Sequence, residues 1–158
     1  GLNGKWKDRR ISLYGRNSAS GTYGFFKENA LFKGDFKSSV NEQPGSGSVV
    51  QAVTKDKFGI GYSGIGYKTS GVKTVALAFD NSNTISKPTY NNVLNGSYPL
   101  ARYLYIYINN SPGKPMDKLL KEFLKFVLSY RGQKIVIKDG YIPLPREVVE
   151  QEIQKLNL

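Results

Sequence analysis

The sequence of 158 residues contains no cysteine and no histidine. Without cysteine, the chain has no disulfide, no thiolate metal ligand and no thiol nucleophile. Without histidine, it lacks the side chain that most often serves as a general base or a metal ligand. Acidic residues are also few, with 12 against 23 lysines and arginines, so the net charge is +11. Such a charge attracts anions: nucleic acid, acidic membranes or small oxyanions.

Long hydrophobic runs are missing as well, since no stretch approaches the roughly 18 to 20 apolar residues of a membrane span. No signal peptide is visible at the N-terminus. The first residues, "GLNGKW", include neither a methionine nor a charged leader, so we expect a fragment or a processed chain. The length suits one ordinary domain, or one domain plus part of another.

Predicted strands and helices alternate along the chain, which indicates an α/β fold. The apolar patterns predict strands at 11–15, 72–79 and 102–108, and a short strand with a turn at 133–145. They predict helices at 22–32, at 48–56 with Ser48 as its N-cap, at 115–132 and at 145–156. Residues 41–48, "NEQPGSGS", are typical of a turn or loop.

Two short motifs match catalytic or cofactor patterns in spacing alone. Residues 59–64, "GIGYSG", match the dinucleotide pattern G-x-G-x-x-G, but the "IGYKTSG" that follows is no helix, which that motif requires. A glycine-rich strand and turn is the better interpretation. Residues 111–114, "SPGK", match S-x-x-K, yet Pro112 and Gly113 disfavour the helical turn that would bring the lysine to the serine.

Tyrosines interleaved with basic residues, as in "ARYLYIYI", are compatible with single-stranded nucleic acid binding. However, Tyr103, Tyr105 and Tyr107 alternate, so they lie on one face of an extended strand. A buried sheet face explains them at least as well.

The most informative stretch is "GRNSASGTYGFF", residues 15–26. A helix that begins here presents unpaired backbone N–H groups and a partial positive charge, which favour a bound oxyanion. Ser20 and Thr22 add hydroxyl groups, Gly21 leaves its own N–H open, and Arg16 and Ser18 can turn toward the same ligand. A solvated loop with Ser20 as a plain helix cap accounts for the same residues. The stretch alone leaves both interpretations open.

Taken together with later blocks, this stretch resembles a known family. "RNSASGT" is similar to the signature R-x-[SD]-x-S-G-T of the phosphate-binding proteins of high-affinity phosphate ABC transporters. The matching later blocks, in the same order, are "GSGSVVQAVTKDKFGIGYSGIGY", "YPLARYLYIYIN", "EFLKFVLSYRGQKIV" and "DGYIPLP". The resemblance covers essentially the whole chain.

The resemblance implies a class II periplasmic binding protein, in which a hinge joins two α/β lobes and phosphate lies between them. Residues 1–97 would then be part of the second lobe, which carries the phosphate site. Residues 98–158 would be the hinge crossing and the C-terminal part of the first lobe. The first lobe's N-terminal segment, with its share of the site, would be missing from this chain.

The resemblance also implies the site residues. It assigns phosphate contacts to Arg16, Ser18, Ser20, Gly21 and Thr22, with no catalytic residue, metal or cofactor. The position of Ser18 is often an aspartate in the family, where it accepts a hydrogen bond from protonated phosphate. A serine both donates and accepts hydrogen bonds, so Ser18 would not repel a fully charged oxyanion as an aspartate would.

The implied function is that of the substrate-binding component of an ABC importer, which is not an enzyme. It would bind inorganic phosphate and deliver it to a membrane permease, from a periplasmic or extracellular position, with a lipid anchor as one means of tethering. We expect a monomer when the protein is complete, and no nucleic acid partner. The alternative is a basic anion- or nucleic-acid-binding surface protein. A phosphate-ester hydrolase is disfavoured, because the sequence has no histidine and no evident metal cluster.

Overall fold

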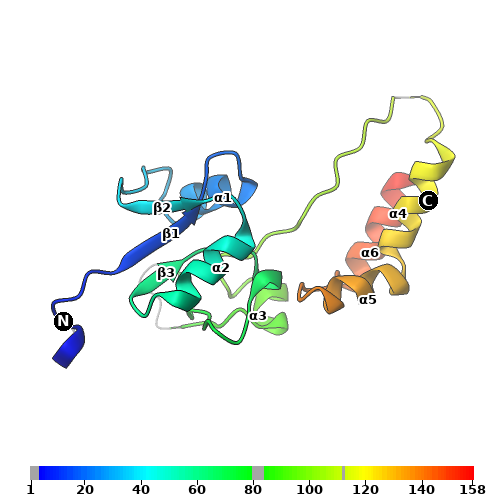
Figure 1. Ribbon diagram of the computed structural model, residues 1–158. Helices are drawn as coiled ribbons and strands as arrows, with labels where there is room; N and C mark the ends of the chain where they lie inside the picture. The colour runs from blue at the N-terminus through cyan, green and yellow to red at the C-terminus, as the bar shows by residue number, and fades with distance from the viewer. Residues whose placement is uncertain (1–3, 80–83, 112) are drawn as a thin grey trace. The chain divides into compact units, whose positions relative to one another are not determined.

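The computed structural model describes residues 4–79, 84–111 and 113–158 (Figure 1). The chain divides into two compact units, Gly1–Leu77 and Ala78–Leu158. The described part of the first unit is α/β and that of the second is helical. Within the described ranges, no helix is both long and apolar enough to cross a membrane.

A three-stranded parallel sheet forms the centre of the first unit. The strands are β1 (Ser12–Arg16), β2 (Val40–Gln43) and β3 (Gly59–Gly61), and their order in the sheet is β2-β1-β3. Helix α1 (Gly21–Asn29) joins β1 to β2, and α2 (Ser46–Lys55) joins β2 to β3. Two 3-10 turns, η1 (Gly4–Trp6) and η2 (Ile65–Tyr67), flank this α/β core in sequence. The expected α/β fold is confirmed.

The strand order places a change of direction at β1. The chain first moves from β1 to β2 on one side, and then crosses to β3 on the other side. In open α/β sheets, ligands bind at such a reversal, outside the carboxyl ends of the strands. The segment after Arg16, the last residue of β1, therefore occupies the favoured position for a binding site.

Helix α2 packs closely on the sheet. Its residues Val49 and Val50 are buried, and they are the buried apolar side chains of this unit within the described ranges. A Cβ on Gly61 would lie 2.8 Å from the carbonyl oxygen of Tyr14 and 2.9 Å from Cγ1 of Val49, so only glycine permits this approach. The hydrophobic contact of α2 thus fixes β3 against β1.

The start of α2 differs from the prediction. The helix begins at Ser46 with Gly45 as its N-cap, two residues before the expected start. Ser48 instead lies in the first turn, where its hydroxyl accepts from the Gly45 amide (3.1 Å) and donates to the Gly45 carbonyl (2.8 Å). A serine at the third helical position bonds back to the backbone of the N-cap residue. Ser48 therefore stabilises a helix that begins at Ser46, whereas Ser48 as the N-cap would place the start of the helix after itself.

The second unit contains α3 (Tyr90–Leu94), α4 (Lys118–Leu128), α5 (Tyr130–Lys138) and α6 (Arg146–Leu156). A single helix over 115–132 followed by a strand was expected, and this prediction is wrong. Ser129 adopts an extended backbone and ends α4, and its hydroxyl accepts from the Gly132 amide (3.2 Å) to start α5. Gly132 is no helix stop: a Cβ there would clash with the Phe126 and Val127 carbonyls, so it permits the sharp turn between the helices.

Two β-prone segments form no ladder. Residues 72–76 and 101–108 lie outside every helix and strand, and Tyr105 and Tyr107 are 68% and 92% exposed. The strand predictions for 72–79 and 102–108 are therefore wrong for this chain, and the three alternating tyrosines do not cover a buried face. A strand needs a partner for its backbone groups, and no strand of the described sheet pairs with residues 102–108. Part of the "SPGK" motif lies outside the described residues.

Candidate functional site

The candidate site lies where the three strands end. The β1 end is tied to the β2 end by the Asn17 amide, which donates to the Gln43 carbonyl at 3.3 Å. The loop after β3 is tied to the start of α2 by the Ser63 hydroxyl, which donates to the Ser46 carbonyl at 3.0 Å. These bonds join the first turns of α1 and α2 to one edge of the sheet.

Arg16 is the charged group of this edge. Its Nη1 donates to the Ser46 hydroxyl at 2.9 Å and its Nη2 donates to the Pro44 carbonyl at 3.2 Å. Its Nε is buried and has no hydrogen-bond partner. Within the described ranges no carboxylate forms an ion pair with Arg16. A half-buried guanidinium that is held by neutral oxygens alone keeps its full positive charge available for an anion.

Tyr62, directly after β3, fixes the backbone of Arg16. Its hydroxyl accepts from the Arg16 amide at 3.2 Å and lies 3.4 Å from the Arg16 carbonyl. A Cβ on Gly15 would lie 2.9 Å from the Tyr62 ring, so Gly15 makes room for it. The other face of the tyrosine stacks on Phe26 of α1, with ring centroids 4.1 Å apart. Burial raises the pKa of the Tyr62 hydroxyl, which therefore stays protonated at neutral pH.

Neighbouring residues of β1 point to opposite sides of the sheet. Gly15 faces the α1 side, where Tyr62 and Phe26 stack. Arg16 faces the α2 side and contacts Ser46. The alternation thus directs the guanidinium toward the N-terminus of α2, while the chain itself continues toward the N-terminus of α1.

The start of α1 has features of both a plain helix cap and an open site for an oxyanion. Ser20 is the N-cap, with its hydroxyl accepting from the Thr22 amide at 3.1 Å, as expected of a plain cap. The Gly21 amide has no partner among the described residues, and Gly21 is exposed. The helix start therefore leaves an open N–H group beside the Ser20 and Thr22 hydroxyls.

The five predicted contact residues lie on one continuous segment at this edge. Arg16 ends β1, Ser18 lies in an exposed turn, and Ser20, Gly21 and Thr22 begin α1. The fold brings them together as the sequence predicted. Their contact with phosphate stays a prediction.

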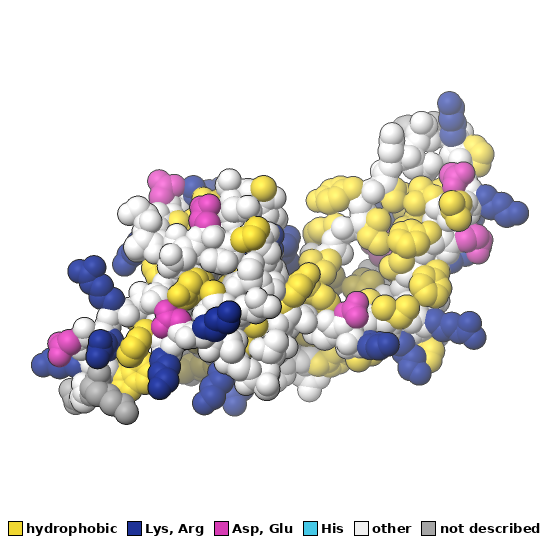
Figure 2. All heavy atoms as spheres, in the orientation of Figure 1, with side chains coloured by type: hydrophobic (Ala, Val, Ile, Leu, Met, Phe, Trp, Pro, Cys, Tyr) yellow, Lys and Arg dark blue, Asp and Glu magenta, His cyan; other side chains and the backbone are white. Residues whose placement is uncertain are grey.

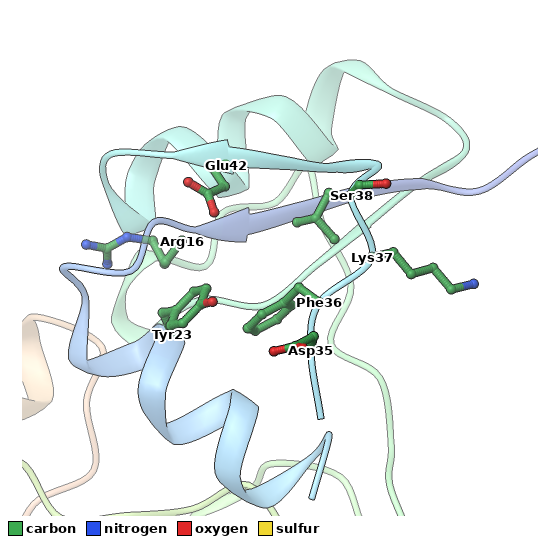
Figure 3. A pocket seen from close by; sticks show the side chains of 8 residues that line it. Arg16, Tyr23, Asp35, Phe36, Lys37, Ser38 and Glu42 are labelled. Carbon is green, nitrogen blue, oxygen red and sulfur yellow. The ribbon is translucent and has the colours of Figure 1, made fainter. Parts of the chain in front are cut away.

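A hollow of about 420 Å³ lies beside the site, between α1, β2 and the segment before β2 (Figure 3). Its walls are Arg16, Tyr23, Asp35, Phe36, Lys37, Ser38, Val40 and Glu42. Arg16 is shared with the candidate site, but its guanidinium points past the strand end, away from Phe36 and Asp35. Asp35 pairs with Lys27 at 2.8 Å. The hollow is thus a neighbour of the candidate site, and the predicted contacts themselves lie on an open surface.

Among the described residues, a second hollow of about 470 Å³ lies in the second unit, between the segment before α4, the start of α4 and the end of α6. Figure 2 shows lysines and arginines spread over the visible face of both units, without a continuous basic groove. The described residues bring together no group of three histidine, cysteine, aspartate or glutamate side chains that could hold a metal ion.

Sequence reasoning missed three contributors to this site: Ser46, Pro44 and Tyr62. Each lies far from Arg16 in sequence, by 28 to 46 residues, and reaches it only through the sheet. The alternating glycine and tyrosine pattern at 59–67 was a usable signal, because a glycine-rich strand often marks close backbone approach.

A sequence profile described as the PBP superfamily domain matches residues 3–131. The chain belongs to the PBP superfamily. The resemblance inferred from the separated sequence blocks is thereby confirmed. The match spans both compact units, so PBP superfamily membership rests on more than the short signature around Arg16.

Curated relatives of this PBP chain carry the name phosphate-binding protein PstS. That of Pseudomonas aeruginosa is 58% identical over 158 residues, which is 100% of this chain and 49% of the relative. That of Staphylococcus epidermidis is 35% identical over 98% of this chain and 47% of the relative. The chain thus spans about half the length of these relatives.

Solved structures agree with this relationship. A putative phosphate ABC transporter substrate-binding protein from Clostridium perfringens, solved with bound phosphate, has a TM-score of 0.70 and 29% identity, covering 89% of this chain and 56% of that one. A possible phosphate-binding protein from Planctomyces limnophilus has a TM-score of 0.66 and 30% identity, covering 98% of this chain and 56% of that one. Similarity at this level extends beyond the local motif to the arrangement of elements.

Proposed function

We propose that this chain is part of the substrate-binding component of an ABC importer, and that it binds inorganic phosphate between two lobes for delivery to a membrane permease. The observation that carries the proposal is the Arg16 guanidinium, which no described carboxylate pairs with, on the segment that leads into the open start of α1. A guanidinium and a helix N-terminus at the carboxyl edge of a parallel sheet together suit a tetrahedral oxyanion.

The names of the relatives support phosphate as the anion. The relatives from Pseudomonas and Staphylococcus are named as phosphate-binding proteins, and the related structure from Clostridium contains phosphate. In this proposal the contacts come from Arg16, Ser18, Ser20, Gly21 and Thr22. Their role is reversible capture, so the protein is a binding protein and not an enzyme.

The lobe assignment is part of the same proposal. Residues 1–97 would belong to the second lobe, and residues 98–158 to the hinge crossing and the first lobe. The exposed apolar side chains in the second unit support a missing partner surface: Leu119 is 80% exposed and Tyr107 is 92% exposed. We propose that the remaining lobe segment covers them, that the complete protein is a monomer, and that it works in the periplasm or outside the cell.

The proposed phosphate contacts set a scale for the affinity of this chain, which would carry only the second lobe's half of the site. About three charge-assisted hydrogen bonds contribute ~1.5–3 kcal/mol each, and a helix N-terminus contributes up to ~2 kcal/mol. Association costs at least ~4 kcal/mol. The remaining ~2–7 kcal/mol brackets millimolar binding, which requires ~4 kcal/mol. Tighter binding by the complete protein would come from the other lobe, closing over the ligand.

The test is a calorimetric titration of the 158-residue chain with inorganic phosphate, at low and high salt. We expect millimolar affinity, displacement by arsenate and a weak dependence on sodium chloride. A parallel titration with single-stranded DNA tests the basic-surface alternative, whose affinity should fall steeply with salt. Sub-micromolar phosphate binding by this chain would contradict the half-site argument, and tight DNA binding without phosphate binding would overturn the proposed function.

A further inference from the structure

Ser46 has an unusual combination of neighbours for the first residue of a helix. It is only 8% exposed, and its hydroxyl accepts from Nη1 of Arg16 at 2.9 Å. Its carbonyl accepts from the Ser63 hydroxyl at 3.0 Å, so the loop after β3 holds it in place. Ser46 is thus a fixed acceptor at the point where the Arg16 side chain ends.

The Arg16 side chain needs a hydrogen-bond acceptor to stay in its position. The guanidinium lies beside the N-terminus of α2, whose partial positive charge repels a cation. An arginine side chain there would gain freedom and lower its energy by swinging into solvent. The bonds from Nη1 to Ser46 and from Nη2 to the Pro44 carbonyl oppose this movement.

The same bonds leave a defined set of donors free. A guanidinium carries five N–H groups, and two of them are directed to Ser46 and Pro44. Nε is buried and unpaired, on the part of the side chain nearest the end of β1. Because Nε is buried, the donors left for an anion are the second N–H groups of Nη1 and Nη2.

We propose that Ser46 is a positioning residue for anion binding: it fixes the Arg16 guanidinium at the carboxyl ends of the strands, in the orientation that binds the anion, and makes no contact with the anion itself. This inference rests on the proposed function and deepens it. It connects α2, which the sequence signature does not include, to the binding step.

A purely structural role for Ser46 makes a different prediction. If the hydroxyl only supports α2, its loss should lower stability, and it should affect binding equally with or without Arg16. If it acts through Arg16, its effect on binding should vanish once Arg16 is removed. A double-mutant cycle separates these two roles.

The experiment uses a protein of the relatives' full length that carries this sequence, titrated calorimetrically with inorganic phosphate. We expect Ser46→Ala to weaken binding roughly tenfold, the equivalent of one charge-assisted hydrogen bond. In the Arg16→Ala background, the same change should alter the dissociation constant less than twofold. Ser46→Thr, which keeps the hydroxyl, should restore most of the affinity.

Ser48→Ala is the matched control, because it removes a serine hydroxyl from the same helix turn. Among the described residues, the Ser48 hydroxyl bonds only to the Gly45 backbone, so its loss should lower the melting temperature and leave phosphate affinity unchanged. Should Ser46→Ala fail to fold, Ser46→Cys takes its place, since a thiol of similar size is a weak acceptor.

Wild-type affinity in a folded Ser46→Ala variant, or an equal loss in both backgrounds, would overturn the positioning role while leaving the proposed function intact. If the wild-type protein does not bind phosphate at all, the proposed function fails and the role of Ser46 fails with it. The two failures are therefore distinguishable in one set of titrations.

Discussion

Replacing Arg16 with alanine should remove most of the phosphate affinity. Two of the five guanidinium N–H groups are committed to Ser46 and Pro44 and the Nε–H is buried, which leaves two for a ligand. If both reach phosphate, at ~1.5–3 kcal/mol each, the loss is ~3–6 kcal/mol. At ~1.4 kcal/mol per tenfold change, the dissociation constant should rise by roughly 10²–10⁴.

The same substitution also perturbs the fold, and the assay must separate the two effects. Without Arg16 the Ser46 hydroxyl, in a residue that is 8% exposed, loses its charged donor. A buried polar group left unpaired costs about 1–3 kcal/mol of unfolding free energy. The melting temperature should therefore be measured first without phosphate and then over a phosphate titration, in a protein of full family length.

Lys37→Ala is the matched control for charge. Lys37 lines the neighbouring hollow, and its side chain points away from the Arg16 guanidinium (Figure 3). Its removal lowers the net charge by the same amount, so we expect less than about a threefold change in affinity, as for an exposed, screened charge. Arg16→Lys keeps the charge but loses the planar fork, and should resemble Arg16→Ala more than wild type. Equal effects of Arg16→Ala and Lys37→Ala would refute the site assignment.

Three further predictions concern the surroundings of the site. Tyr62→Phe removes the acceptor of the Arg16 amide but keeps the ring stack on Phe26. The free energy of unfolding, measured in urea, should fall by about 1–2 kcal/mol, and an unchanged midpoint would show that the Tyr62 hydroxyl does not stabilise the Arg16 backbone. The Ser12 hydroxyl and the Phe58 amide hold the pKa of Asp56 below its ordinary value, so its contribution to stability is complete above the ordinary aspartate pKa and disappears as the pH falls through the lowered one. Asp56→Asn should therefore reduce the acid sensitivity of the urea midpoint below about pH 4, and parallel pH profiles for both proteins would contradict this. Ser18→Asp should make anion affinity depend more strongly on the protonation of the anion, so in calorimetric competition the binding of sulfate should weaken more than that of phosphate. Equal weakening of both would show that Ser18 does not contact the anion.

Local sequence signals were sufficient to predict β1 and the start of α1. The strand 11–15, the Ser20 cap and the glycine after it lie within a dozen residues, so their physics is local. The clustering of the five candidate residues at one edge followed from the same signals. The family resemblance then selected an oxyanion cradle over a plain loop.

Long-range pairing explains what the sequence did not reveal. Residues 41–43, "NEQ", have no apolar character and were expected to be part of a loop, yet they belong to β2, which forms because its backbone pairs with β1 in parallel register. In the other direction, "RYLYIYI" has strong β propensity, but no strand of the described sheet pairs with it, and it remains outside any strand. The role of Ser46 was also missed for lack of long-range information, because the pairing of β2 with β1 is what brings the start of α2 to Arg16.

The helix boundaries in the second unit show a similar limit. The apolar stripe at 115–132 continues smoothly across Ser129, so periodicity alone gives no reason to divide it. The division comes from backbone geometry: the Ser129 hydroxyl donates to the Phe126 carbonyl at 2.7 Å, and Gly132 permits the close approach of the two helices. The expected strand after Gly132 is instead part of α5, because the new cap restarts a helix there.

The alternation of Gly15 and Arg16 makes strand register a condition for recognition. A slip of one residue would exchange their faces, placing the guanidinium against the Tyr62 and Phe26 rings and the glycine toward Ser46. The parallel pairing of Arg16 with Gln43 and of Leu13 with Ile60 excludes this slip. If Arg16 binds the anion as we propose, anion affinity would also measure correct assembly of this sheet: a misaligned chain could keep its helices and lose its affinity.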